Sequence, residues 1–524
     1  MQKHNMRTEK KSSIKNSATR LELIALLVLI QTGWMVFLML KLNAYSTAIT
    51  LALTFIAVFI ALKIFGTHVN SAQRMPWLIV ITAVPFFGIC IYLLFGRSIV
   101  TKGMRRRFNG IESDILVNKL SQDETVIDEI AAKDKGIANQ CRYISHTARY
   151  PVYKNTDVEY YAEADISFAA QIEELKKAEH FIFMEYHAIE DALSFERLKK
   201  VLIEKAQSGV EVRIFYDDLG SIFFLNKEFI KRMREQGIQC RVFNPLKVVV
   251  NMFMNNRDHR KITVIDGRVG FTGGYNLADE YFNITHPYGY WKDTGIKLTG
   301  DAVRSLTASF LTMWNAIDHT DSQADYDKYL DAADNTYKAV DSECYVQPYS
   351  DNPLGQDRIG EDVYLNILKN AKDYVYITTP YLIITDEMER ELRLAVKRGV
   401  DVRIVTPGIP DKKMVYKITR SYYEPLCSAG VRIYEYTPGF CHAKQWVSDD
   451  EMSVVGTINM DFRSLYLHFE NAVFTYNKGL AAKVKKDMLN NFEAGREVTK
   501  DYAKDVIRPL KLGTCILRMI SPLL

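Results

Sequence analysis

Two segments of the chain carry histidine, lysine, aspartate, glycine and asparagine in the same order and at the same spacing. They run over 259–276 and 442–459, and in both the last four residue types follow the histidine by 2, 7, 14 and 17 positions. One His-x-Lys-(x)4-Asp match would be weak, because such short patterns arise by chance. Two copies with the same offsets are a strong signal and predict one site built from two related segments.

The histidine and lysine of each segment suit chemistry on a phosphate group. In a strand, residues i and i+2 project from one face, so His259 lies beside Lys261 and His442 beside Lys444. Imidazole titrates near neutral pH and can attack phosphorus or move a proton, and the lysine ammonium is a compact charge for non-bridging oxygens. Asparagine amides can donate hydrogen bonds to the same oxygens, and the candidates are Asn276 and Asn459.

The two histidines fit a displacement in two steps. One would form a covalent phosphohistidine, while the other would protonate the leaving alcohol and later deprotonate the incoming one. Such a site needs no Mg²⁺, so we expect no cofactor. The seven cysteines lie far apart and include no Cys-x-x-Cys pair, so we expect neither a metal site nor a disulfide framework.

The aspartate of each segment allows two interpretations. Asp266 directly precedes Gly267 between two β-rich runs, which is a hairpin turn signal, and Asp449–Asp450 is the matching turn. Either these aspartates shape the turns or they take part in proton transfer. Three glycines are expected to allow close backbone approach at the site: Gly273, Gly274 and Gly456.

Strand and helix patterns alternate on both sides of the chain's centre. A β-rich run at 180–189 is followed by an amphipathic helix pattern ending at Gly209 and by a second strand. The same order returns from 373 onward, and "GVEVRI" after the first helix matches "GVDVRI" at 399–404. Strand, helix, strand implies a parallel sheet covered by helices, so we expect an α/β fold of two tandem halves with one site between them.

The N-terminal part looks like a membrane module. Three apolar stretches, 23–40, 47–64 and 77–95, each have about the 17–25 residues that a membrane-crossing helix needs. Basic residues flank the first and the last stretch, and both flanks favour the cytoplasm. Three crossings would separate the flanks, so either one stretch is re-entrant or interfacial, or one basic flank is translocated against this rule. Possible weak points are Gln31, Pro76 and Pro85. We expect a multi-pass membrane protein whose catalytic part is cytoplasmic.

Length and composition bound the remaining possibilities. The 524 residues suggest several domain-sized units, and a net charge of +4 argues against a protein built mainly to hold nucleic acid. We divide the chain into a basic cytoplasmic tail, a transmembrane helical module, a basic juxtamembrane linker, two α/β halves and an amphipathic C-terminal tail. Their ranges are 1–20, 21–97, 98–137, 138–340, 341–500 and 501–524. The tail could lie on the bilayer or pack as a terminal core element.

At the paired motif the chain resembles the phospholipase D superfamily, and more specifically the bacterial cardiolipin synthases. The resemblance covers nearly the whole chain and includes "YLLFGR", "NNRDHRK", "GGYNLADEY", "YWKDTGIKLTGDAV" and "VGTINMDFRSLYLHFE". It departs in Ala443, where many relatives have Ser or Thr, and in one additional apolar stretch. The active-site set that the resemblance implies is His259, Lys261, Asp266, His442, Lys444 and Asp449.

The resemblance also implies roles. Two downstream acids, Asp293 and Glu470, are expected to orient the histidines, with His259 as nucleophile and His442 as acid and base. The implied reaction joins two phosphatidylglycerol molecules into cardiolipin and releases glycerol at a lipid bilayer, without nucleic acid. Water as acceptor would make the protein a phospholipase D hydrolase, and phosphatidylethanolamine could serve as donor. A nuclease is disfavoured by the apolar stretches, and a non-catalytic lipid scaffold by the two intact motifs. No oligomeric state is indicated.

Overall fold

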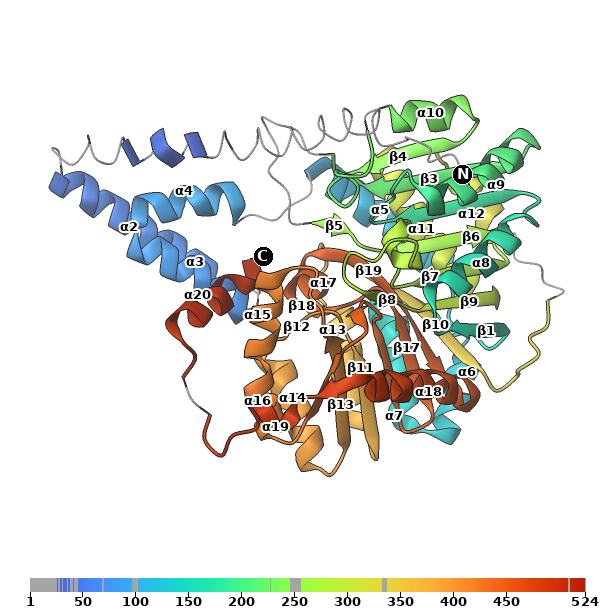
Figure 1. Cartoon of the computed structure of the whole chain (residues 1–524). Helices are drawn as coiled ribbons and strands as arrows, with labels where there is room; N and C mark the ends of the chain where they lie inside the picture. Colours follow the sequence, from blue (N-terminus) through green and yellow to red (C-terminus); the bar gives the residue numbers. More distant parts are fainter. Residues whose placement is uncertain are drawn as a thin grey trace, which may run out of the picture.

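The computed structural model describes residues 46–67, 70–96, 102–226, 228–245, 256–331, 337–507 and 509–523, with single positions between 26 and 41. The basic segment 1–20 and most of the first apolar stretch lie outside the described residues. Two α/β halves form the main body, and the N-terminal helices project from it on the side where the C-terminal helix also lies (Figure 1).

The first half is built on a seven-stranded mixed sheet. Its strand order is β1-β9-β7-β6-β2-β3-β4. The strands are β1 Thr156–Tyr161, β2 Phe181–Tyr186, β3 Glu211–Asp217, β4 Gln239–Phe243, β6 Lys261–Ile265, β7 Val269–Gly273 and β9 Gly295–Gly300. Strands β2 and β3 pair in parallel and are joined by helix α9 (Leu193–Gln207), which confirms the predicted strand-helix-strand unit.

The second half repeats this arrangement. Its order, β10-β19-β17-β16-β11-β13-β14, places equivalent strands in equivalent positions and adds β20 (Gly495–Glu497) at the edge. The strands are β10 Tyr345–Asp351, β11 Tyr374–Thr378, β13 Asp401–Pro407, β14 Arg432–Tyr436, β16 Gln445–Ser448, β17 Met452–Gly456 and β19 His468–Tyr476. Strands β11 and β13 are parallel and joined by α14 (Asp386–Lys397), as predicted.

A buried helix links the two sheets. Helix α11 (Val303–Ile317) packs against β2, β6, β7 and β9 of the first half and against β10 of the second. Nearly all of its side chains are buried, and Phe310 stacks on Phe183 of β2 with ring centroids 4.6 Å apart. Its Thr307 and Thr312 hydroxyls donate to carbonyl oxygens one turn earlier in the helix, so these polar groups can be buried together with the apolar ones. Its burial therefore fixes how the halves sit against each other.

The expectation of a juxtamembrane linker at 98–137 is wrong for its described part. This part forms α5 (Lys102–Asn118) and α6 (Glu124–Lys133), and α5 packs along α11. Phe108 and Ile115 of α5 lie in the main core because the helix carries apolar residues on one face. Two arginines of α5 also bind the two α/β halves. Arg105 donates to the Leu354 carbonyl, and Arg107 donates to the Ala316 carbonyl.

The N-terminal helices form a small packed group. Helix α2 (Ser46–Phe65) contacts α3 (Ser71–Ala83) and α4 (Pro85–Phe95). The third apolar stretch is thus two helices, because Val84 leaves helical geometry before Pro85, whose ring disfavours helical conformation in the preceding residue. Within the residues that can be described, no helix combines the length and apolar character needed to span a bilayer. The C-terminal helix α20 (Leu512–Ile520) packs on α3 and on α15 (Lys413–Ser421).

Candidate active site

Short strand pairings between the halves position both histidines. The two-residue strand β5 (Arg257–Asp258) runs parallel to the start of β19, and β15 (Gly439–Cys441) runs parallel to β8 (Tyr290–Lys292). As a result, the His259 backbone N–H donates to the Phe469 carbonyl at 2.9 Å, and the His442 N–H donates to the Lys292 carbonyl at 2.7 Å. Each histidine is therefore fixed by the residue that precedes the acid of the other half.

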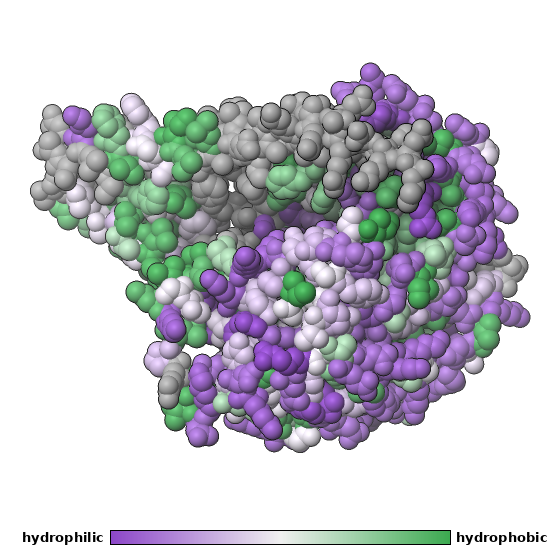
Figure 2. Space-filling model, viewed as in Figure 1, coloured by the Kyte–Doolittle hydropathy of each residue, from purple (hydrophilic) through white to green (hydrophobic). Residues whose placement is uncertain are grey.

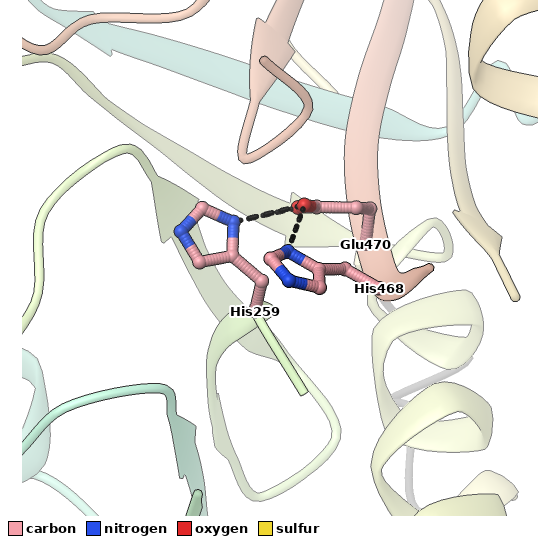
Figure 3. Close-up of side chains that lie close together, drawn as sticks. All are labelled: His259, His468 and Glu470. Carbon is pink, nitrogen blue, oxygen red and sulfur yellow. Dashed lines mark hydrogen bonds and ion pairs between the residues drawn. The ribbon is translucent and has the colours of Figure 1, made fainter. Parts of the chain in front are cut away.

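The side chain of each histidine also contacts the other half of the molecule. His259 Nδ1 lies 2.9 Å from both carboxylate oxygens of Glu470 (Figure 3). His442 Nδ1 lies 2.7 Å from Asp293 Oδ2. Both carboxylates are fully buried. A carboxylate only accepts, so each ring carries its proton on Nδ1 and its unprotonated Nε2 is the reactive nitrogen.

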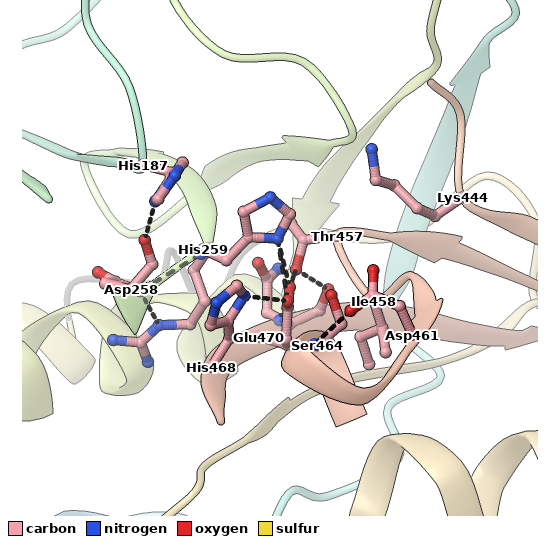
Figure 4. A network of polar contacts seen from close by, with 12 residues as sticks. His187, Asp258, His259, Lys444, Thr457, Ile458, Asp461, Ser464, His468 and Glu470 are labelled. Carbon is pink, nitrogen blue, oxygen red and sulfur yellow. Dashed lines mark hydrogen bonds and ion pairs between the residues drawn. The ribbon is translucent and has the colours of Figure 1, made fainter. Parts of the chain in front are cut away.

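Glu470 and Asp293 have different neighbours at equivalent positions of the two halves. Thr457 Oγ1 donates to Glu470, and the Thr457 N–H donates to the Asn471 carbonyl at 2.8 Å (Figure 4). The equivalent position in the first half is Gly274, where a Cβ would lie 2.0 Å from Asp293 Oδ1. Glycine is therefore required there, because the aspartate carboxylate occupies the space that a threonine side chain fills in the other half.

Both motif lysines are buried beside the histidines. Lys261 Nζ donates to the His259 carbonyl, and Lys444 Nζ makes the same contact with the His442 carbonyl. The Lys444 ammonium also lies 2.9 Å from both ring nitrogens of His442. Two ammonium groups thus stand next to two imidazoles, which is an arrangement suited to a phosphate anion.

Burial and mutual repulsion shift the titration of all four groups. Burial lowers the pKa of Lys261 to about 7 and that of Lys444 to about 8. Burial and the neighbouring lysines also hold the pKa of His259 well below its usual range and lower the pKa of His442 to about 4. At neutral pH, both histidines are therefore neutral before a substrate binds.

The two asparagines predicted to bind phosphate are both buried near the site, but their amides differ. Asn276 accepts from the Ala188 N–H at 3.2 Å and donates from Nδ2 to the Tyr281 hydroxyl at 2.8 Å. Asn459 Oδ1 is buried and has no hydrogen-bond partner among the described residues. If Asn276 binds phosphate, its amide must donate both to the phosphate and to the Tyr281 hydroxyl.

The contacts of Asp266 and Asp449 favour the turn interpretation over a place in the catalytic set. The carboxylate of Asp266 accepts from the backbone N–H groups of 179–181, and that of Asp449 accepts from those of 372–374, all between 2.7 and 2.9 Å. Both residues have a φ of 53°, in the left-handed region. They hold the turn at the far end of each motif strand, which supports the structural interpretation of the Asp-Gly signal.

Two further histidines, which belong to neither motif, lie near the site. His187 has its ring centroid 5.0 Å from that of His259, and its Nδ1–H donates to the Asp258 carbonyl at 2.7 Å. His468 lies 5.5 Å from His259 by ring centroids and 3.5 Å from Glu470 Oε1 (Figure 4). His468 and Glu470 are two residues apart on one strand, so spacing could have revealed this neighbour. Nothing in the sequence places His187.

One group of side chains has the donor types of a metal site. The donor atoms of His259, His468 and Glu470 all lie within 4.8 Å of one another (Figure 3). The carboxylate is already bound to His259, and the nearby ammonium groups of Lys261 and Lys444 repel a cation. Their charges favour an anion at this place.

Together, the paired sheets and the His–Lys pairs define a phospholipase D-like protein. Residues 171–314 and 364–492 match the family model described as "Cardiolipin synthase, PLD-like domain", and residues 52–97 match "Phospholipase_D-nuclease N-terminal". A cardiolipin synthase of Geobacillus thermodenitrificans is 34% identical, and the alignment covers 92% of this chain and 94% of that protein. The chain belongs to the cardiolipin synthase family, whose members are enzymes of the phosphatidyltransferase type.

Two other proteins are similar to this chain. A Streptococcus mutans protein described only as uncharacterized is 39% identical, over 88% of this chain and 99% of its own length. The solved structure of phosphatidylserine synthase from Haemophilus influenzae superimposes with a TM-score of 0.53 at 14% identity, covering 70% of this chain and 94% of that one. The structural similarity shows a shared fold.

Asp266→Ala should destabilise the protein without a specific loss of catalysis. Three backbone N–H groups would lose a charged acceptor, and alanine would have to adopt the left-handed region, so we expect a cost of about 2–3 kcal/mol. Thermal denaturation of both proteins measures this, and Asp266→Asn should be milder because asparagine tolerates the same backbone conformation. If instead Asp266→Ala unfolds at the wild-type temperature but has lost turnover, Asp266 belongs to the chemistry.

Proposed function

We propose that this chain transfers a phosphatidyl group from one phosphatidylglycerol molecule to another, giving cardiolipin and glycerol. The exchange of carboxylates between the halves carries the proposal: each histidine is held through Nδ1 by the acid of the other half, and two ammonium groups flank them. Two equivalent imidazoles facing one anion site fit a reaction in which a phosphodiester is opened and then re-formed.

In the first step, Nε2 of His259 attacks phosphorus. The bond between phosphorus and the headgroup oxygen breaks, and His442 donates a proton to the departing glycerol. A phosphatidyl group then remains on His259, and Glu470 stabilises the positive charge of the ring. Lys261 and Lys444 compensate the negative charge of the non-bridging oxygens.

In the second step, a hydroxyl of another phosphatidylglycerol attacks the same phosphorus. His442 takes the hydroxyl proton, and the phosphorus–nitrogen bond to His259 breaks. His442 is then protonated again for the next cycle, so one proton moves back and forth and none is consumed.

His442 takes up the proton that starts the cycle from solvent when the substrate anion binds. In the empty site, burial and Lys444 hold the pKa of His442 at about 4, so this ring is neutral at pH 7. A bound phosphodiester brings a negative charge that offsets the lysines and raises the pKa of both histidines. Binding and protonation are therefore coupled.

The same site could pass the phosphatidyl group to water or take it from another donor. Hydrolysis would give phosphatidic acid, and phosphatidylethanolamine has the same diester linkage. Membership of the cardiolipin synthase family favours transfer to phosphatidylglycerol over both alternatives.

We also propose that the N-terminal helices and α20 attach the catalytic body to a bilayer, with that body in the cytoplasm. Hydrophobic surface gathers over these helices, whereas the catalytic halves are mainly hydrophilic (Figure 2). Phe55 and Phe59 of α2 are 76% and 68% exposed, and Leu512 and Ile516 of α20 are 77% and 50% exposed. Large apolar patches of this kind mark membrane or protein contacts.

The product assay is the direct test of the reaction. Detergent-solubilised protein with radiolabelled phosphatidylglycerol should release glycerol and cardiolipin in equal amounts, measured by mass spectrometry. After rapid alkaline quenching, the label should remain on the peptide that contains His259. His442→Ala should slow turnover by about 10²–10⁴-fold because it removes the acid and base. Phosphatidic acid as sole product would refute transfer, and label on the peptide of His442 would reverse the roles of the histidines.

The pH profile tests the lysines. The pKa values of about 7 and about 8 mean that Lys261 and Lys444 lose their charge as pH rises through this range. We therefore expect kcat/KM to be highest on the acid side and to fall as pH increases from 7 to 9. Lys261→Arg keeps a cation throughout and should move this decline to higher pH. A profile that is flat from pH 6 to 9 would contradict the assignment.

The apolar face of α20 can be tested with vesicles. Replacing Leu512 and Ile516 by Gln should reduce binding to phosphatidylglycerol vesicles in a flotation assay, because two exposed apolar contacts are lost. Leu489→Gln is the matched control, since Leu489 is a 37% exposed leucine on α18 (Lys478–Ala494), away from these helices (Figure 1). Equal flotation of both variants would mean that α20 is a terminal packing element.

A further inference from the structure

The two halves are equivalent in backbone but not in the residues that surround the two histidines. Counting from the motif histidines, Phe440 and Arg257 occupy the same position, two residues before each. Counting from the orienting acids, Trp291 and His468 are equivalent in the same way. Strand pairing supports this alignment, because Phe440 lies opposite Trp291 and Arg257 lies opposite His468.

His442 is enclosed by aromatic rings. The centroids of Trp291, Tyr281 and Phe440 lie 5.2, 5.4 and 5.7 Å from that of His442. Trp291 also contacts the other two rings, at 4.5 and 4.9 Å, so the three form one continuous wall. All three side chains are buried, and the Trp291 indole N–H has no acceptor among the described residues.

His259 has polar residues at the equivalent places. His468 stands where Trp291 stands in the other half, Arg257 replaces Phe440, and Ser464 is the counterpart of Tyr281, five residues after the motif asparagine. Figure 4 shows His468 and Ser464 beside Glu470, below the His259 ring. The guanidinium of Arg257 is held by Asp217 at 3.3 Å. The asymmetry is thus consistent at all three positions.

The aromatic wall surrounds the histidine that receives the proton of the attacking alcohol. This step rests on the proposed function, in which His442 is the acid and base. The hydroxyl that His442 activates, whether of water or of a lipid headgroup, comes to a ring that this wall encloses. Aromatic surface binds water poorly, but it packs well against the CH groups of a glycerol unit. Excluding water from a reactive intermediate protects it from hydrolysis.

We propose that Trp291, Tyr281 and Phe440 form an acceptor-selecting subsite, which admits the glycerol headgroup of a lipid to His442 and excludes water. The wall thereby decides that the phosphohistidine is resolved by transfer and not by hydrolysis. The unpaired indole N–H of Trp291 offers a hydrogen bond to an oxygen of the bound headgroup.

The product ratio tests this subsite, because each turnover ends either in cardiolipin or in phosphatidic acid. Trp291→His places in this half the residue that the other half has at the equivalent position. We expect its ratio of cardiolipin to phosphatidic acid to fall several-fold on phosphatidylglycerol vesicles. Trp291→Phe keeps an aromatic ring and should stay near the wild-type ratio. Because the ratio is taken per turnover, partial unfolding of a variant does not change it.

His468→Trp is the matched control on the other side of the site. It should leave the product ratio unchanged, whatever it does to the rate. The subsite is refuted if Trp291→His keeps the wild-type ratio, or if His468→Trp shifts the ratio as strongly. If the wild-type protein itself releases only phosphatidic acid, the proposed function fails and not merely the subsite.

Discussion

Each motif histidine is held by a carboxylate from the other half of the molecule. Asp293 of the first half holds His442 of the second, and Glu470 of the second holds His259 of the first. Backbone hydrogen bonds from the two histidines to Phe469 and Lys292 reinforce the exchange. Among the described residues, neither motif histidine is held by an acid of its own half, so every element that fixes the halves together, and α11 above all, also fixes these two pairs.

The electrostatics of the site follow from this enclosed geometry. Two buried lysines and two buried carboxylates stand around two imidazoles, and burial disfavours every charge among them. Burial, and after it the neighbouring lysines, lower the pKa of both histidines, so the rings stay neutral until an anion binds. A phosphodiester supplies the missing negative charge, and the ordered ammonium and imidazole groups need little rearrangement to receive it. The cost of burying these charges is offset by the strand pairings that hold them.

Near-equivalence of the halves gives two imidazoles, but a two-step transfer needs two different environments. A nucleophile and an acid–base group can share a backbone geometry and still differ in neighbours. Here the differences gather at three equivalent pairs, with aromatic rings around His442 and polar groups around His259. The surroundings of the two acids also differ. Thr457 donates a hydrogen bond to Glu470, whereas Gly274 leaves room for the Asp293 carboxylate. The repeated fold gives the two histidines equivalent backbone positions, and a few neighbouring side chains make their environments different.

The amino-acid sequence alone determined the repeated motif, the strand-helix-strand units and the spacing of histidine and lysine, because these are local patterns. It predicted the His–Lys pairs within strands, whereas His259 lies before β6 and residues 442–444 lie between β15 and β16. It also offered a turn as one of two roles for Asp266, though not its three backbone partners. Only the tertiary structure decided which acid serves which histidine, that α5 is a core helix, and that His187 lies beside His259. These contacts join residues far apart in the chain, and their partners are set by how two sheets pack around α11, which no local pattern specifies.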